Sequence, residues 1–168
     1  VVAPLSTLER TWADEVFENF AHLSWCVLHG SKEKRLKLLA TEADVYIVNH
    51  DGVKILADAL KSRKDIDIVV IDEIASFRNA RTDRWKALNK VTQARKWVWG
   101  LTGTPTPNEP TDAWAQCRLI CPERVPKYAL AFRDMVMRQL SQFLWIPRDN
   151  VTEIVHQAMQ PSIRFKRD

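Results

Sequence analysis

The strongest constraint on the fold is an apolar run that ends in two acidic residues. Val69–Ile71 lead directly into Asp72 and Glu73. Such a run predicts a buried parallel strand with both carboxylates at its carboxyl tip, where open α/β sheets bind their ligands. Paired carboxylates there suit a magnesium-nucleotide site, because one can hold the water shell of the metal while the other takes a proton from attacking water.

A second segment, Leu101–Pro105, reads Leu-Thr-Gly-Thr-Pro and predicts the end of a neighbouring strand. The hydroxyls of Thr102 and Thr104 would hydrogen-bond toward the acidic pair or to a phosphate, although an ordinary turn at Gly103 would give the same pattern. None of the four glycines lies in a G-x-x-x-x-G-K-[ST] pattern, so the phosphate cradle of a nucleotide site is missing. Half of a nucleotide site is therefore visible.

The composition fits one domain with a sizeable core, at 168 residues and 46% apolar. No apolar run approaches membrane-spanning length and no secretion signal is present. We therefore expect a cytoplasmic protein of a bacterium or virus-infected cell, or a nuclear protein, without membrane contact. The net charge of +4 permits a nucleic-acid partner without requiring one. We expect Cys117 and Cys121 to be buried apolar residues, because a metal would need two further ligands.

Strand and helix patterns alternate along the first two thirds of the chain. Strands are expected at Val1–Ala3, Trp25–Leu28, Val45–Val48, Ile66–Ile71 and Lys96–Leu101. Helices are expected after Ser6 and over Ser31–Leu39, Val53–Leu60 and Thr82–Val91. Strands joined by helical crossovers predict a RecA-like α/β fold, with a parallel sheet and helices on both of its faces.

The last third of the chain has a helical pattern. Helices are expected over Thr111–Ile120, Tyr128–Phe143 and Thr152–Met159. We expect a partial RecA-like lobe over residues 1–122 and a helical C-terminal extension over residues 123–168. The extension would form a subdomain or continue the same core, and the sequence leaves both possibilities open.

Individual side chains carry further predictions. Ser6 has the position of a helix cap and begins a capping-box pattern, and the free N–H groups behind it also suit a phosphate. In the basic helix, Arg35 is expected outside and Leu36 inside. Trp97 and Trp99 share one face of their strand, where packing against helices is favoured over stacking on bases.

Five segments of the chain form an ordered set of motifs: Val1–Leu8 with Trp12 and Glu15 behind it, Asp44–His50, Asp72–Asn79, Leu101–Asn108 with Trp114 following, and Ile163–Arg167. Their order resembles that of the first motor lobe of superfamily-two helicase-like ATPases, most closely the Snf-type DNA translocases. Five motifs in this order are far more specific than any one of them, and they span nearly the whole chain.

The resemblance implies a role for each matching residue. Asp72 would hold Mg²⁺ through water, and Glu73 would position or deprotonate the attacking water. Thr102, Gly103 and Thr104 would couple ATP hydrolysis to the grip on DNA. Nucleic-acid contacts are implied at Ser6, Thr7, Asn49, His50, Arg164 and Lys166. From the residues alone, Asn49 and His50 could equally be a helix start, and the basic residues near the C-terminus could be a solvated face.

Three departures from the family pattern shape the expected function. In the family, the phosphate loop and the adenine-binding segment both precede the residue that is Val1 here. The family usually has a His two places after the acidic Glu, and this chain has Ala75 there. The second lobe with its arginine finger is also absent. We expect a lobe of an ATP- and Mg²⁺-dependent translocase that grips the backbone of duplex DNA and is inactive by itself. The alternative is a non-catalytic nucleic-acid-binding or scaffold module that retains the motor fold.

Overall fold

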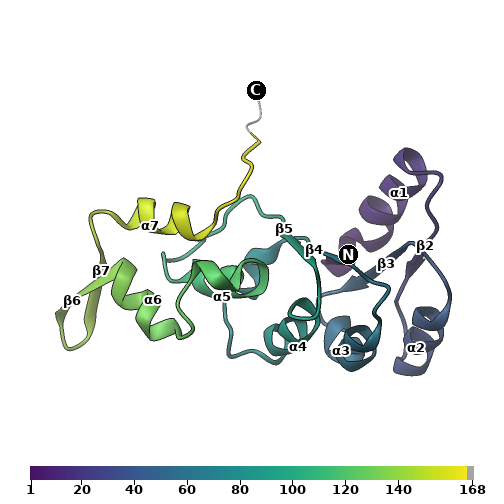
Figure 1. The fold of residues 1–168 in the computed structure, drawn as a ribbon, viewed down its shortest axis with the longest axis horizontal. Helices are drawn as coiled ribbons and strands as arrows, with labels where there is room; N and C mark the ends of the chain where they lie inside the picture. The colour runs from purple at the N-terminus through teal and green to yellow at the C-terminus, as the bar shows by residue number, and fades with distance from the viewer. Residues whose placement is uncertain (166–168) are drawn as a thin grey trace.

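A five-stranded parallel sheet forms the centre of the protein (Figure 1). The computed structural model describes residues 1–165. The strand order is β2-β3-β1-β4-β5, and every neighbouring pair is parallel. The bounds in that order are Trp25–Val27, Val45–Asn49, Val2–Ala3, Ile68–Ile71 and Trp97–Gly100. All five carboxyl ends therefore lie along one edge of the sheet, as the strand pattern predicts.

Helices lie on both faces of the sheet. One face carries α2 (Lys32–Ala40), α3 (Gly52–Ser62), α4 (Asp83–Thr92) and α5 (Asp112–Ile120), and their apolar side chains share the main core cluster with β1, β3 and β4. The other face carries a 3₁₀ turn η1 (Leu5–Thr7), a π-helical segment η2 (Leu8–Ala13) and α1 (Asp14–Asn19). Because η2 contacts β2 and β3, it buries a small second cluster around Leu8 and Ile47.

Two tryptophans that the sequence predicts to be buried are exposed. Trp97 and Trp99 are 52% and 55% exposed, and Ile68, which pairs with Trp97 in the next strand, is 45% exposed. The prediction was wrong because η2 packs on β2 and β3, and its Trp12 contacts Asp72 just beyond the end of β4. Within residues 1–165, no helix packs on this face of β4 and β5, and β5 is an edge strand.

The basic helix α2 is rotated from the predicted orientation. Its cap is Ser31, whose hydroxyl accepts a hydrogen bond from the Lys34 N–H. Arg35 is buried and Leu36 is exposed, the reverse of the expectation. The guanidinium of Arg35 donates to the carbonyl oxygens of Leu28 (2.6 Å) and Gly30 (2.8 Å) at the end of β2. These hydrogen bonds satisfy a charged group inside the protein, which hydrophobic periodicity does not anticipate.

The C-terminal extension contains a β-hairpin in place of half of a predicted helix. Helix α6 (Ala129–Val136) ends where β6 (Met137–Ser141) begins, and β6 pairs antiparallel with β7 (Leu144–Pro147). Arg148 explains the end of the helix. Its backbone N–H donates to the Val136 carbonyl (2.9 Å) and its side chain donates to the Asp134 and Met137 carbonyls (3.1 Å each). A helix that continued to Phe143 would use all three of these carbonyls for its own hydrogen bonds.

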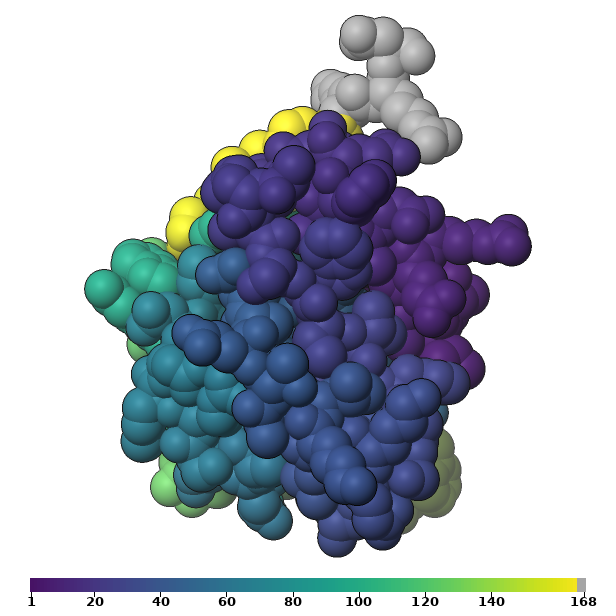
Figure 2. All heavy atoms as spheres, turned by 90° about the vertical axis from the view of Figure 1, so that its right-hand side faces the viewer, coloured from purple at the N-terminus to yellow at the C-terminus, as the bar shows by residue number. Residues whose placement is uncertain are grey.

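Helix α5 joins the sheet to the extension. Ala115 and Leu119 belong to the main core, whereas Ala113 and Cys117 pack in a separate cluster with α6 and with α7 (Val151–Ala158). Because α5 belongs to both core clusters, the domain boundary expected at residue 122 stays a prediction. In Figure 1 the hairpin lies at the opposite end of the molecule from α2, and Figure 2 shows the α2 end covered mostly by the N-terminal half of the chain. In residues 1–165 no helix is both long and apolar enough to cross a membrane.

Candidate functional site

The acidic pair lies at the carboxyl tip of β4, between β1 and β5. The Asp72 N–H donates to the Val2 carbonyl (2.8 Å), and the Leu101 N–H donates to the Ile71 carbonyl (2.8 Å). The carboxylate of Asp72 is itself fixed by two donors. Its Oδ1 accepts from the Glu73 backbone N–H and its Oδ2 accepts from the indole Nε1–H of Trp12, both at 3.0 Å. Asp72 therefore presents a carboxylate of set orientation at the edge where parallel sheets bind ligands.

Glu73 has a left-handed backbone conformation, with φ 49° and ψ 50°. A residue with a Cβ atom pays about 1–2 kcal/mol for this conformation. The bend lets the chain leave β4 sharply and enter the 3₁₀ turn η3 (Ile74–Phe77), whose first N–H donates to the Leu101 carbonyl (3.0 Å). The Glu73 side chain is left exposed at the tip of the strand. Strain at a residue of this kind is typical of functional sites.

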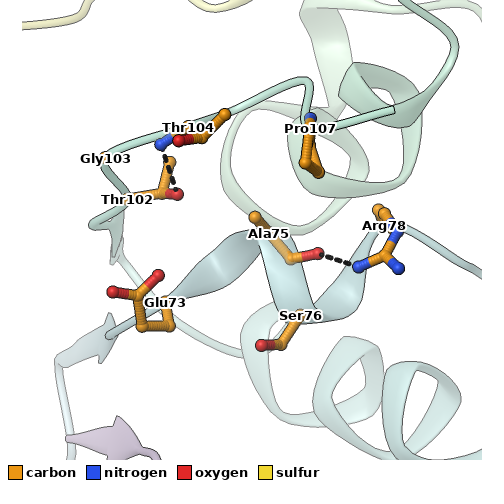
Figure 3. A pocket seen from close by; sticks show the side chains of 8 residues that line it. All are labelled: Glu73, Ala75, Ser76, Arg78, Thr102, Gly103, Thr104 and Pro107. Atoms are coloured by element: carbon orange, nitrogen blue, oxygen red, sulfur yellow. Dashed lines mark hydrogen bonds between the residues drawn. The ribbon is translucent and has the colours of Figure 1, made fainter. Parts of the chain in front are cut away.

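A hollow of about 310 Å³ lies between the acidic tip and the end of β5 (Figure 3). Its lining residues are Glu73, Ala75, Ser76, Arg78, Thr102, Gly103, Thr104 and Pro107. The turn is held by the Thr104 N–H, which donates to the Thr102 hydroxyl (3.2 Å). In Figure 3 Glu73 lies beneath this turn, and Arg78 lies on the opposite side of the hollow. The structure thus brings together Glu73 and the three residues predicted to couple hydrolysis to movement.

Asn49 and His50, predicted to contact nucleic acid, both have partners inside the protein. The Asn49 side-chain oxygen accepts from the Arg35 guanidinium (3.0 Å). His50 is buried, its Nε2 lies 2.9 Å from the Asp72 carbonyl oxygen, and its ring packs edge-on against Phe77. Burial lowers the pKa of His50, so the ring is neutral at neutral pH and its Nε2–H donates to Asp72. His50 therefore supports the acidic strand tip from the end of β3, whereas Asn49 helps to hold the buried guanidinium of Arg35.

Ser6 and Thr7 lie just beyond the end of β1, at the same edge of the sheet. The predicted cap at Ser6 was wrong, because neither η1 nor η2 has a side-chain cap hydrogen bond. The segment winds first as a 3₁₀ turn and then as a π-helix, and regular α-helix begins only at Asp14. Ser6 is exposed, and the Thr7 hydroxyl donates to the Pro4 carbonyl (3.1 Å). Their contacts with nucleic acid stay a prediction.

The two predicted basic contacts lie beyond α7. Arg164 is exposed, and Lys166 lies outside the described residues. Cys117 and Cys121 both point their sulfur atoms at the Ala158 carbonyl (3.4 and 3.5 Å), which ties α5 to α7. No cluster of three metal-binding side chains occurs in the part of the chain that the structure describes.

Trp12 is the site residue that sequence patterns missed. Its spacing from Leu8 and Val16 predicts a core position on an α-helix, and the structure places its indole N–H on the Asp72 carboxylate. Arg78 was likewise not singled out, although it lines the hollow. The π-helical winding of η2 leaves no signal in a single sequence, so the contact between Trp12 and Asp72 could not be found from periodicity.

The model of the SNF2-related domain matches residues 1–163. The chain belongs to the SNF2-related domain family. Its parallel sheet is the RecA-like fold of that family, with a TM-score of 0.61 to the Sulfolobus solfataricus SWI2/SNF2 ATPase core in complex with dsDNA. The two chains are 25% identical, and the match covers 79% of this chain and 26% of the Sulfolobus chain.

Two further proteins match in sequence. Protein p41 of Acyrthosiphon pisum secondary endosymbiont phage 1 is 33% identical over 126 residues, which cover 69% of this chain and 27% of p41. The ISWI chromatin-remodeling complex ATPase ISW2 of Saccharomyces cerevisiae is 27% identical over 128 residues, which cover 73% of this chain and 11% of ISW2. This SNF2-related domain therefore spans about a quarter or less of each relative.

Proposed function

We propose that this SNF2-related domain is the first motor lobe of an ATP-dependent translocase that moves on duplex DNA. The observation that carries the proposal is the shared hollow, in which Glu73 and the Thr102–Thr104 turn face each other beside the fixed carboxylate of Asp72. The carboxylate proposed to be catalytic and the segment proposed to couple hydrolysis to movement are thus adjacent, although they follow different strands. The Sulfolobus relative, whose structure contains dsDNA, supports DNA as the polymer.

The chemistry of the donor set fits a hydrated Mg²⁺ ion. Each carboxylate oxygen of Asp72 accepts one hydrogen bond and keeps lone-pair capacity for waters around the metal. Mg²⁺ is commonly held by one or two carboxylates together with substrate phosphates, and when bound it neutralises charge on the transferred phosphoryl group. Asp72 would hold this ion through water, as expected from the family resemblance.

Glu73 would act on the attacking water. Its carboxylate is exposed on the hollow side of the strand tip, where it can accept a proton or orient the water through a hydrogen bond. The hydroxyls of Thr102 and Thr104 would couple ATP hydrolysis at this site to the contacts with DNA. Ser6, Thr7 and Arg164 would hold DNA phosphates, which gives a grip independent of base sequence.

The phosphate groups of ATP need further ligands. The sequence contains no G-x-x-x-x-G-K-[ST] loop, and so it supplies no lysine and amide nest of that type. We expect such a loop in another segment of a longer protein, together with a second lobe that closes the cleft. Residues 1–168 alone should therefore hydrolyse ATP slowly or not at all.

The decisive experiment is Glu73→Gln in the longest natural protein that contains this domain, with ATP hydrolysis measured with and without duplex DNA. Loss of the general base should lower the rate by on the order of 10²-fold or more. Glu42→Gln, at an exposed acid away from the site, is the matched control. An unchanged rate in Glu73→Gln would reject Glu73 as the general base. The absence of ATP hydrolysis in the unaltered protein, with and without duplex DNA, would favour the non-catalytic binding module.

A further inference from the structure

The hydrogen bond between Trp12 and Asp72 joins two segments that are 60 residues apart. The Trp12 indole is half-buried beside the small core cluster of Ala3, Leu8 and Ile47. Among residues 1–165, it supplies the one hydrogen bond from another side chain to the Asp72 carboxylate. Since Oδ1 is already occupied by the Glu73 N–H, the indole removes the remaining rotational freedom of the carboxylate.

The π-helical winding of η2 explains how Trp12 reaches this position. In an α-helix, Leu8 and Trp12 would lie on one face, because residues four apart are neighbours there. A π-helix closes its hydrogen bonds five residues apart, which turns Trp12 away from the Leu8 direction. Leu8 is accordingly buried against the sheet, whereas Trp12 is only half-buried and its N–H faces Asp72. Single π turns inside helices are frequent at functional sites.

The same segment leads directly to Ser6 and Thr7, which the proposed function assigns to nucleic acid. One short stretch, Leu5–Ala13, thus has polar side chains for DNA at its start and the Asp72 contact near its end. The alternative connection through residue 75 carries no polar side chain, because that residue is Ala75. Within the described residues, no hydrogen bond joins the Thr102 or Thr104 side chain to Asp72 or Glu73.

We propose that Trp12 is a positioning residue that couples DNA binding at Leu5–Ala13 to metal binding at Asp72. When DNA phosphates fix this segment, the indole holds the carboxylate in the orientation that the hydrated ion requires. When the segment is free, the indole N–H is held less firmly and the carboxylate loses that constraint. This inference rests on the proposed function for the identity of the two ligands.

The test compares Trp12→Phe with the unaltered natural protein that contains this domain. Phenylalanine keeps an aromatic ring and removes the N–H donor. The Mg²⁺ concentration for half-maximal ATP hydrolysis should rise by about tenfold, the lower end of the effect of losing a partner of a metal-binding side chain. Stimulation by duplex DNA should fall in parallel. Trp25→Phe, on β2 and away from Asp72, is the matched control and should change neither quantity.

A variant that retains the Mg²⁺ response and the DNA stimulation of the unaltered protein would overturn the proposal. If Trp12→Phe does not fold, NMR of the unaltered chain decides instead. The indole N–H resonance of Trp12 should shift as MgCl₂ is added, and that of Trp25 should not. A Trp12 resonance insensitive to Mg²⁺ would reject the coupling. Glu73→Gln tests the proposed ATPase separately, so failure of that activity and failure of the Trp12 coupling give different results.

Discussion

Because Glu73 has a left-handed backbone conformation, we predict that glycine at this position gives a more stable protein than alanine does. Glu73→Ala and Glu73→Gly both remove the carboxylate, and they differ only in whether residue 73 keeps a Cβ atom. The left-handed conformation costs about 1–2 kcal/mol when a Cβ is present. Glycine escapes this cost but loses about 0.5–1 kcal/mol through its greater freedom in the unfolded chain. The glycine variant should therefore be more stable than the alanine variant by about 0.5–1 kcal/mol.

The control lies two residues away, in the turn η3 that follows Glu73. Ala75 belongs to the right-handed turn η3, so Ala75→Gly gains no relief and should lose about 0.5–1 kcal/mol. The same pair of residue types thus has opposite effects at positions 73 and 75. Urea unfolding followed by the fluorescence of the seven tryptophans measures all three variants. In thermal unfolding, a difference of about 1 kcal/mol corresponds to about 2–4 °C for a domain of this size.

The reasoning would be refuted if Glu73→Gly were less stable than Glu73→Ala by the same free energy of unfolding that Ala75→Gly loses. That result would mean that residue 73 has an ordinary backbone conformation. The predicted result would instead mean that this position gives up stability to hold a carboxylate at the strand tip. A scaffold module would have no reason to keep that cost, so the outcome also bears on the proposed function.

Three other perturbations have expected outcomes. Because the pKa of buried His50 is lowered, the unfolded chain binds a proton at a higher pH than the folded chain does. The free energy of unfolding should therefore decline as the pH falls below about 6.5. In urea titrations, His50→Gln should flatten this decline and exposed His29→Gln should not. Gly52→Ala places a Cβ against the buried Arg35 guanidinium and should cost about 1–3 kcal/mol on unfolding, whereas an unchanged midpoint would show that Arg35 moves freely. Trp99→Gln, at an exposed position, should alter the free energy of unfolding by less than about 0.5 kcal/mol, and a larger loss would mean that this side chain is covered.

The strands and the acidic tip could be predicted because they depend on local signals. The apolar run before Asp72 fixes a buried strand, and parallel strands place their carboxyl ends at one edge whatever their order. For the same reason, the hollow shared by Glu73 and Thr102 follows from two strand ends being neighbours, which the register of Ile71 opposite Gly100 shows. The motif order predicted the family, which the match over residues 1–163 confirms.

The errors arose where tertiary contacts outweigh local preference. Residues 137–143 have the composition of a helix, yet Arg148 binds the carbonyls that end α6 and the chain turns into a hairpin. Arg35 was assigned to the surface because charged residues are rarely buried, but backbone carbonyls at the end of β2 satisfy its guanidinium. Ser6 fits a capping pattern, although the helix behind it begins with π-helical winding. Hydrophobic periodicity records which residues are apolar, so it carries no signal for a buried guanidinium bonded to backbone carbonyls or for π-helical winding.

The uncovered outer strand β5 has a practical consequence for anyone who purifies this chain. An edge strand exposes unpaired N–H and C=O groups to other molecules, and here it lies beside the exposed Trp97 and Trp99. The ammonium of Lys96 lies 5.6 Å from the Trp97 ring centre, and its charge repels the same group of a second copy. Salt screens this repulsion. Aggregation should therefore increase with protein concentration and ionic strength, and dilute, low-salt samples should behave best.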